Sequence, residues 1–134
     1  MPEDQTTTTD ASPHKGKTGV VRIYRALFYS LDGLASACKH ESAFRQELVL
    51  AVVLIPTALL LTVTLTQKAL LCGSVLLVMI VELLNSAVEA TVDRISMDEH
   101  ELSKRAKDFG SAAVLLSLIV WALVWALVLY ERFA

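Results

Sequence analysis

Residues 69–94 read ALLCGSVLLVMIVELLNSAVEATVDR, a long apolar run that turns polar toward its end. The run before Glu82 carries no charge. As a helix rising ~1.5 Å per residue, it covers about 20 Å of a hydrocarbon core that is ~30 Å thick. Glu82 therefore falls below the membrane surface, whereas Asp93 falls in water. The stretch predicts a transmembrane helix, spanning about residues 69–92, whose polar end climbs from hydrocarbon into the aqueous phase.

The polar residues of this helix share one face. Glu82, Asn85, Glu89 and Asp93 are separated by three, four and four positions, which at ~100° per residue confines them to an arc of roughly 80°. An ionisable residue inside a spanning helix is costly and points to function. The alternative is that Glu82 and Asn85 only hold helices together. Two carboxylates and an amide on one stripe favour the functional interpretation.

Two more stretches are long and apolar enough to span a bilayer, residues 48–65 and residues 112–130. Pro56 interrupts the first, which membrane helices tolerate with a local kink. We expect residues 66–68 to form a tight turn between the first two spans. The chain is 54% hydrophobic and 19% charged, against about 25% charged residues in soluble domains. An all-α membrane protein with three spanning helices follows.

The N-terminal part of the chain divides into a tail and an amphipathic segment. Residues 1–19 are polar and rich in threonine, so we expect a disordered tail. Residues 20–38 place apolar side chains at three- and four-residue steps, with Arg22 and Arg25 on another face. This pattern suits a helix lying on an anionic membrane surface. The alternative is a helix packed on the protein's own core.

Basic residues predict the orientation, because cytoplasmic loops carry the excess of Lys and Arg. Those before the first span and between the second and third are Lys15, Lys17, Arg22, Arg25, Lys39, Arg45, Arg94, Lys104, Arg105 and Lys107. Only Lys68 and Arg132 fall on the other side. We expect the N-terminus and a loop over residues 93–108 to be cytoplasmic. The net charge of −2 gives no reason to expect a nucleic-acid partner.

Two further polar clusters accompany the stripe. The first is Glu41, Arg45, Gln46 and Glu47, in which Glu41 and Arg45 by themselves read as an i, i+4 surface pair. The second, within residues 101–111, reads by itself as a solvated basic connector. Together with the stripe, both clusters ring the cytoplasmic rim of the bundle. Carboxylates there suit Mg²⁺, and basic residues suit phosphate. The few glycines allow neither a P-loop nor a G-x-G-x-x-G motif.

Three ordered motifs resemble those of the bacterial integral membrane diacylglycerol kinases. Residues 82–94, ELLNSAVEATVDR, resemble the family's ELLNSAVEAxVDR signature. Residues 41–47, ESAFRQE, are similar to its E-x-A-F-R-Q-E motif, and residues 103–113 to its S-x-R-A-K-D-x-G-S-A-A motif. The resemblance runs from about Arg22 to the C-terminus and leaves the tail uncovered.

The resemblance implies an activity and an assembly. Such enzymes move the γ-phosphoryl group of ATP onto the primary hydroxyl of diacylglycerol, giving phosphatidate, with Mg²⁺ as the metal. They are homotrimers in the bacterial inner membrane, with three spanning helices and a surface helix per chain. Their sites lie between subunits at the cytoplasmic boundary. The membrane kinase domain would then cover residues 20–134 of this chain.

The resemblance also implies roles for individual residues. Glu82 would be the general base, and Glu41 and Glu89 would hold Mg²⁺. The nucleotide would meet Arg22, Tyr29, Asp98, Glu99, His100, Lys107 and Asp108. The substrates would meet Arg22, Ser30, Phe44, Gln46, Glu47, Glu82, Asn85 and Ser111. This chain has Glu99 where relatives often carry an aromatic residue, and Leu31 and Asp32 where they often carry an aromatic and a basic one.

Three other functions stay open from the sequence. A kinase of the same fold acting on undecaprenol would share these motifs. A small ion- or proton-coupled transporter would use Glu82 as a relay. A non-catalytic membrane scaffold would use it only for packing, and neither of the last two would turn over ATP.

Overall fold

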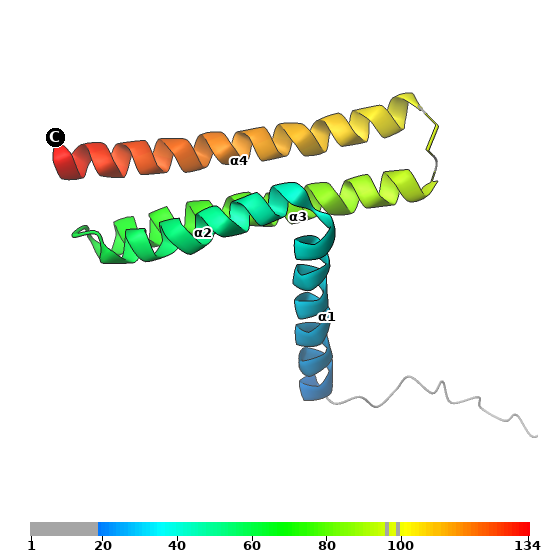
Figure 1. The fold of residues 1–134 in the computed structure, drawn as a ribbon, viewed down its shortest axis with the longest axis horizontal. Helices are drawn as coiled ribbons and strands as arrows, with labels where there is room; N and C mark the ends of the chain where they lie inside the picture. Colours follow the sequence, from blue (N-terminus) through cyan, green and yellow to red (C-terminus); the bar gives the residue numbers. More distant parts are fainter. Residues whose placement is uncertain (1–18, 96, 99) are drawn as a thin grey trace, which may run out of the picture. The chain divides into compact units, whose positions relative to one another are not determined.

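The computed structural model describes residues 19–95, 97–98 and 100–134, and the regular elements among these are all helices (Figure 1). Four are found: α1 (Gly19–His40), α2 (Ser42–Leu60), α3 (Leu65–Ile95) and α4 (Glu101–Phe133). The chain divides into two compact units, Met1–Ala35 and Ser36–Ala134. The predicted tail up to residue 18 and Glu99 both lie outside the described residues.

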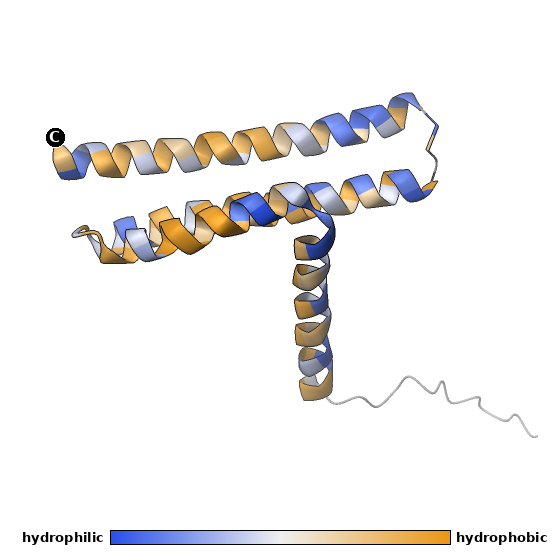
Figure 2. Ribbon diagram, viewed as in Figure 1, coloured by the Kyte–Doolittle hydropathy of each residue, from blue (hydrophilic) through white to orange (hydrophobic). Residues whose placement is uncertain are grey.

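Three of the helices, α2, α3 and α4, are long and apolar enough to cross a membrane, which confirms the predicted fold class of three spanning helices after an amphipathic one. Their middle parts are apolar, and polar residues gather where α3 meets α4 (Figure 2). With 31 and 33 residues, α3 and α4 measure about 46 Å and 50 Å. Both therefore exceed a hydrocarbon core ~30 Å thick.

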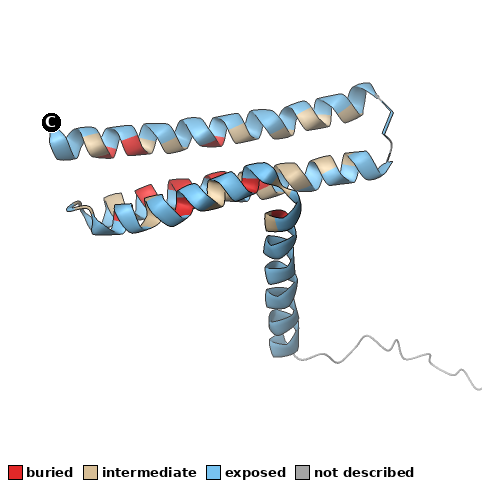
Figure 3. Ribbon diagram, in the orientation of Figure 1, coloured by how far each residue is buried: buried red, intermediate tan, exposed pale blue. Residues whose placement is uncertain are grey.

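Short connections make α3 antiparallel to α2 before it and to α4 after it, and α3 packs on both of these helices. Their buried side chains lie on the faces that meet (Figure 3). The core cluster consists of Ala51, Ala58, Leu71, Val75, Trp125 and Val128. Ala58 is fully buried, as expected where a small residue lets membrane helices approach closely. Trp125 also packs in this core, with 8% of its surface exposed.

The turn between the first two spans lies earlier than predicted. Placing it at residues 66–68 is wrong, because α2 ends at Leu60 and α3 begins at Leu65. A capping box starts α3: the Gln67 N–H donates to Thr64 Oγ1 over 3.2 Å, and the Thr64 N–H donates to Gln67 Oε1 over 2.9 Å. At the other end of the turn, Lys68 Nζ donates to the Leu59 carbonyl oxygen over 2.6 Å.

The second connection is also shorter than the predicted loop over residues 93–108. Helix α3 continues through Ile95 and α4 begins at Glu101, so most of that range is helical. Its charges stabilise helix instead of preventing it, because Arg105 pairs with Glu101 at 3.1 Å and Lys104 with Asp108 at 3.0 Å, both at i, i+4.

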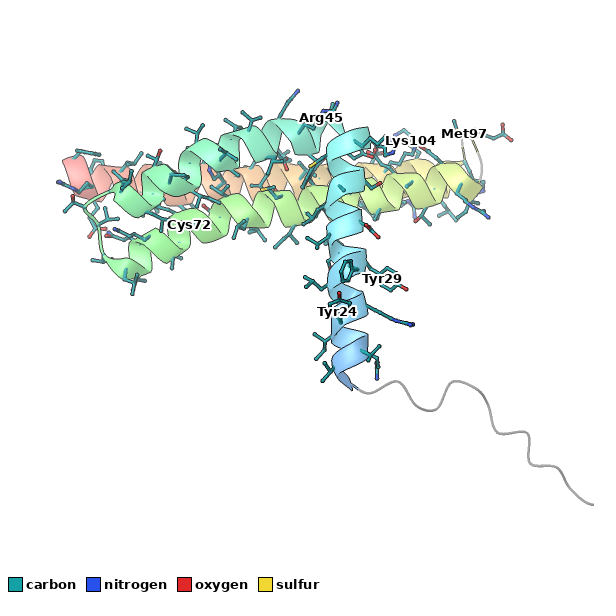
Figure 4. The ribbon with its side chains drawn as sticks, turned by 60° about the horizontal axis from the view of Figure 1, so that its bottom comes forward. Tyr24, Tyr29, Arg45, Cys72, Met97 and Lys104 are labelled. Atoms are coloured by element: carbon teal, nitrogen blue, oxygen red, sulfur yellow. The ribbon has the colours of Figure 1, made fainter. Side chains whose placement is uncertain are left out.

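Helix α1 matches the predicted amphipathic segment within a turn at each end. Its large apolar side chains are exposed: Val20, Val21, Ile23, Tyr24, Leu27, Phe28, Leu31 and Leu34. The rings of Tyr24 and Phe28 lie 4.7 Å apart in an edge-on arrangement, and Figure 4 shows Tyr24 on this helix. An exposed apolar face of this size suits a membrane surface, and that position stays a prediction.

An elbow joins α1 to α2 at Glu41, whose backbone is extended with φ −105° and ψ 111°. Arg45, labelled in Figure 4, donates from Nη1 to the carbonyl oxygens of Cys38 and Lys39 at 3.1 and 3.2 Å. The interpretation of Glu41 and Arg45 as a surface ion pair within one helix is therefore wrong. The helix breaks at Glu41, and the guanidinium satisfies the last carbonyl groups of α1, which lack helical partners.

We predict that Arg45→Met loosens this elbow. Losing two charge-assisted hydrogen bonds at an exposed site should cost roughly 1 kcal/mol, and the last turn of α1 should fray. Trypsin should then cleave after Lys39 several times faster than in the wild type. Arg25→Met is the control, because it removes the same charge from an exposed position of α1. Equal cleavage rates after Lys39 in both variants would contradict the capping role.

Candidate active site

Glu82 is the only charged side chain that is buried within the described residues, with 6% of its surface exposed. It continues a buried stripe along α3 at helical spacing, after Leu71, Val75 and Val78. Because α3 is one unbroken helix, Asn85 and Glu89 follow Glu82 on the same face, as predicted. The apolar packing face of α3 thus turns into the polar stripe without leaving the interior of the bundle.

Four glutamates gather around this point. Glu89 and Glu41 are the like-charged neighbours of Glu82, and Glu82 is in turn the like-charged neighbour of Glu47. None of the four forms an ion pair in the part of the chain that the structure describes. One oxygen of Glu47, Oε2, is buried without a hydrogen-bond partner. The elbow, α2 and α3 together form a cluster of negative charge. A bound cation would relieve the repulsion between these carboxylates.

Asn85 stands between the two carboxylates of the α3 stripe. Its Nδ2 donates to Glu89 Oε1 over 3.4 Å, a long hydrogen bond along one turn of the helix. Its Oδ1 is buried and has no hydrogen-bond partner. The amide is thus held on the Glu89 side, and its carbonyl end faces the interior of the bundle.

A hollow of about 200 Å³ opens where α3 and α4 meet. Its lining is Val92, Asp93, Met97, Asp98, His100, Ser103, Lys104, Lys107 and Asp108. Four residues predicted to meet a nucleotide, Asp98, His100, Lys107 and Asp108, are therefore brought together. Met97 and Lys104 mark this end of the two helices in Figure 4. His100 also caps α4, because its Nδ1 accepts from the Leu102 N–H over 3.1 Å.

Ion pairs organise the hollow. Lys107 Nζ lies 2.6 Å from Asp93 Oδ1, which ties α4 to α3, and Lys104 Nζ lies 3.0 Å from Asp108 Oδ2. The sequence placed Asp93 on the polar stripe and Lys104 among the basic residues that suit phosphate, but it gave neither of them an ion-pair partner. For Lys104 the i, i+4 spacing to Asp108 was a readable signal. The Lys104 side chain is 77% exposed and that of Lys107 is 42% exposed, so a phosphate oxygen could replace their carboxylate partners.

No group of three or more His, Cys, Asp or Glu side chains among the described residues is arranged to hold a metal ion by itself. This agrees with how proteins bind Mg²⁺, which usually takes one or two carboxylates together with water and substrate phosphates. Glu41 and Glu89 offer the oxygen donors that Mg²⁺ prefers, and Lys107, which is paired with Asp93, is a positively charged neighbour of Glu89. The donor set fits, and ligation by these two residues stays a prediction.

The other predicted residues differ in exposure. Gln46 and Ser111 are exposed, whereas Phe44 is 1% exposed and packs within its own unit. Arg22, Tyr29 and Ser30 are exposed on α1, in the separate unit, and the Ser30 hydroxyl donates to the Ala26 carbonyl over 2.9 Å. Roles for these residues stay predictions.

Comparison with known proteins adds independent findings. A family model described as prokaryotic diacylglycerol kinase matches residues 28–129. A diacylglycerol kinase of Pseudomonas aeruginosa is 54% identical over 118 residues, which cover 88% of this chain and 96% of the relative. The enzyme of the same name from Escherichia coli K12 is 51% identical over 116 residues, covering 87% and 95%. One from Haemophilus influenzae is 50% identical over 113 residues, covering 84% and 96%.

Proposed function

This chain belongs to the prokaryotic diacylglycerol kinase family, and on that premise we propose that it transfers the γ-phosphoryl group of ATP to the primary hydroxyl of diacylglycerol, giving phosphatidate. The observation that carries the proposal is the position of Glu82. It is a buried carboxylate at the point where the apolar face of α3 becomes polar. A lipid hydroxyl and a water-borne nucleotide can meet only at such a boundary.

We propose that Glu82 accepts the proton of the lipid hydroxyl as the oxygen attacks the γ-phosphorus. The P–O bond to the leaving ADP breaks as the new P–O bond forms. Phosphoryl transfer asks for positioning and charge neutralisation more than for covalent help, so one base and a set of oriented groups suffice. Asn85, Gln46, Glu47 and Ser111 would orient the substrates, together with Ser30 and Phe44.

ATP would lie across the hollow at the α3–α4 end. Lys107 is held in place by Asp93, and it would exchange this partner for a phosphate oxygen. Asp108, Asp98, His100 and Glu99 would complete the nucleotide site with Arg22 and Tyr29. Glu41 and Glu89 would hold Mg²⁺, which when bound neutralises charge on the phosphate oxygens. The four clustered glutamates would otherwise repel the triphosphate.

We further propose that the protein works as a homotrimer in the bacterial inner membrane, with its N-terminus and active site in the cytoplasm. The excess of basic residues before α2 and around the α3–α4 connection supports this orientation. A single chain has only three spanning helices, and its polar stripe covers a narrow arc. Within one chain Glu82 is already buried, whereas Asn85 and Glu89 are only partly buried. Packing this end of the stripe against a neighbouring chain would cover them as well, and an exposed charge in hydrocarbon costs several kcal/mol.

Lipid phosphorylation by the purified protein tests the function. With ATP and Mg²⁺ we expect phosphatidate from diacylglycerol, and a much slower reaction with undecaprenol. Glu82→Gln should lose about 10²–10⁴-fold in turnover, the usual effect of removing a general base, while keeping the helical content and thermal unfolding of the wild type. Faster phosphorylation of undecaprenol would transfer the proposal to that lipid. Near-normal turnover in a folded Glu82→Gln protein would refute the role of Glu82.

We predict that Glu41→Ala and Glu89→Ala each raise the Mg²⁺ concentration required for half-maximal rate. Losing one of only two protein ligands weakens a site that otherwise consists of water and phosphate. Activity measured over a Mg²⁺ titration at saturating ATP gives the shift. Glu131→Ala is the control, because its carboxylate bonds to Gln67 at the opposite end of the bundle. If both site variants follow the wild-type titration curve, these glutamates are not metal ligands.

We also predict that mixing two inactive variants restores activity if the site is shared between chains. Glu82→Gln and Asp108→Asn would be reassembled together from denatured protein. Trimers formed from the mixture would then contain some sites that have every native group. Recovered phosphorylation supports the shared site. Inactive mixtures, despite demonstrated exchange of chains, would mean that Glu82 and Asp108 of one site belong to the same chain, and Glu41→Ala mixed with Glu82→Gln is the next pair.

A further inference from the structure

Helix α4 contains one glycine, Gly110, away from its ends. Glycine at such a position weakens a helix, so its presence there needs a structural explanation. The reason is visible in its surroundings. A Cβ atom at this position would overlap Asn85 Oδ1, and it would lie 3.2 Å from Asn85 Cγ and 3.8 Å from Asn85 Cα. All three of the nearest atoms belong to Asn85. By contrast, a Cβ at Gly33 or Gly73 would meet nothing within 4 Å.

The bare backbone of Gly110 thus faces the carbonyl end of the Asn85 side chain. An ionised carboxylate only accepts hydrogen bonds, so the amino group of Asn85 must face Glu89. This turns Oδ1 toward α4, where it is buried and has no conventional donor. The hydrogen of Gly110 that replaces a Cβ lies on the same side, which is the arrangement of a weak Cα–H···O hydrogen bond between packed helices.

We propose that Gly110 is a positioning residue for Glu89, acting through Asn85, and this rests on the kinase function proposed above. The close approach of α4 fixes the rotamer of Asn85, and Asn85 fixes the carboxylate of Glu89. The ion pair between Lys107 and Asp93 lies one turn further toward the α3–α4 connection and clasps the same two helices. Glu89 is held between these two contacts, in one orientation toward its proposed metal.

The first test needs no activity, because Asn85 is the only asparagine in the chain. Protein labelled with ¹⁵N at the asparagine side-chain amide, in detergent micelles, should give a single NH₂ pair in a ¹H–¹⁵N spectrum. Gly110→Ala and Glu89→Gln should each shift this pair, whereas Gly73→Ala, a helix glycine with open surroundings, should leave it in place. An unmoved pair in a folded Gly110→Ala protein overturns the proposal.

The second test measures consequence for the reaction. Gly110→Ala should raise the Mg²⁺ concentration for half-maximal rate several-fold, as Asn85→Ala should, and the Asn85→Ala/Gly110→Ala double variant should be no worse than Asn85→Ala alone. Gly73→Ala should keep the wild-type value. Two outcomes would overturn the positioning role of Gly110. The first is a shifted Asn85 NH₂ signal in Gly110→Ala with an unchanged Mg²⁺ requirement. The second is a double variant whose Mg²⁺ requirement rises by the combined effects of the two single variants. If the wild type shows no kinase activity, the proposed function fails, and the spectrum still decides the contact.

If Gly110→Ala alone does not fold, the double variant still tests the contact. Asn85→Ala removes the two side-chain atoms nearest to the added methyl group, leaving Cα at an ordinary contact distance. The double variant should therefore unfold at a higher temperature than Gly110→Ala. If both unfold alike, the cost lies elsewhere in α4 and the contact with Asn85 is not what Gly110 provides.

Discussion

A helix that crosses a bilayer cannot leave an ionised carboxylate against hydrocarbon without a cost of several kcal/mol. Glu82 lies in the middle part of helix α3, so the neighbouring helices have to cover its carboxylate. Packing between α2 and α4 supplies that cover, so that Glu82 is 6% exposed. The buried positions Leu71, Val75 and Val78 lead to it along one face, which makes the helix-packing surface and the chemical surface the same stripe.

The unequal lengths of the helices divide the site between two phases. Helix α2 measures about 28 Å, close to the thickness of the hydrocarbon, whereas α3 and α4 are about 18–22 Å longer. Their excess includes the hollow with its lysines and aspartates, beyond the level of Glu82. A nucleotide bound there, as proposed above, would remain hydrated, while a lipid hydroxyl would need only to reach the carboxylate cluster. On that proposal, the extra length of α3 and α4 would let one site serve two substrates of opposite solubility.

Much of this was readable from the sequence, because hydrophobic length and three-four spacing are local properties. The spans, the amphipathic α1 and the shared face of Glu82, Asn85 and Glu89 follow from them. The start of α3 was readable as well, since Thr64-Leu-Thr-Gln67 is a capping-box pattern. Three contacts were not: Arg45 with the end of α1, Lys107 with Asp93, and Gly110 with Asn85. Each depends on where two helices or a chain reversal bring groups together, which no spacing rule encodes.

The direction in which the polar stripe of α3 runs distinguishes an enzyme at the membrane surface from a proton-coupled transporter. A proton-coupled transporter needs ionisable groups along the whole path across the membrane. In the described helices, three segments between Glu82 and the far end carry no acidic, basic or histidine side chain: residues 69–81 of α3, 48–60 of α2 and 112–130 of α4. The core at that level is Ala58, Leu71, Val75, Trp125 and Val128. The next ionisable groups, Lys68 and Glu131, have partners of their own at the opposite end. The acidic side chains of α3 therefore continue from Glu82 toward the α3–α4 connection and not toward the opposite end of the bundle. This one-sided arrangement suits a reaction at one membrane surface better than a proton path across the membrane.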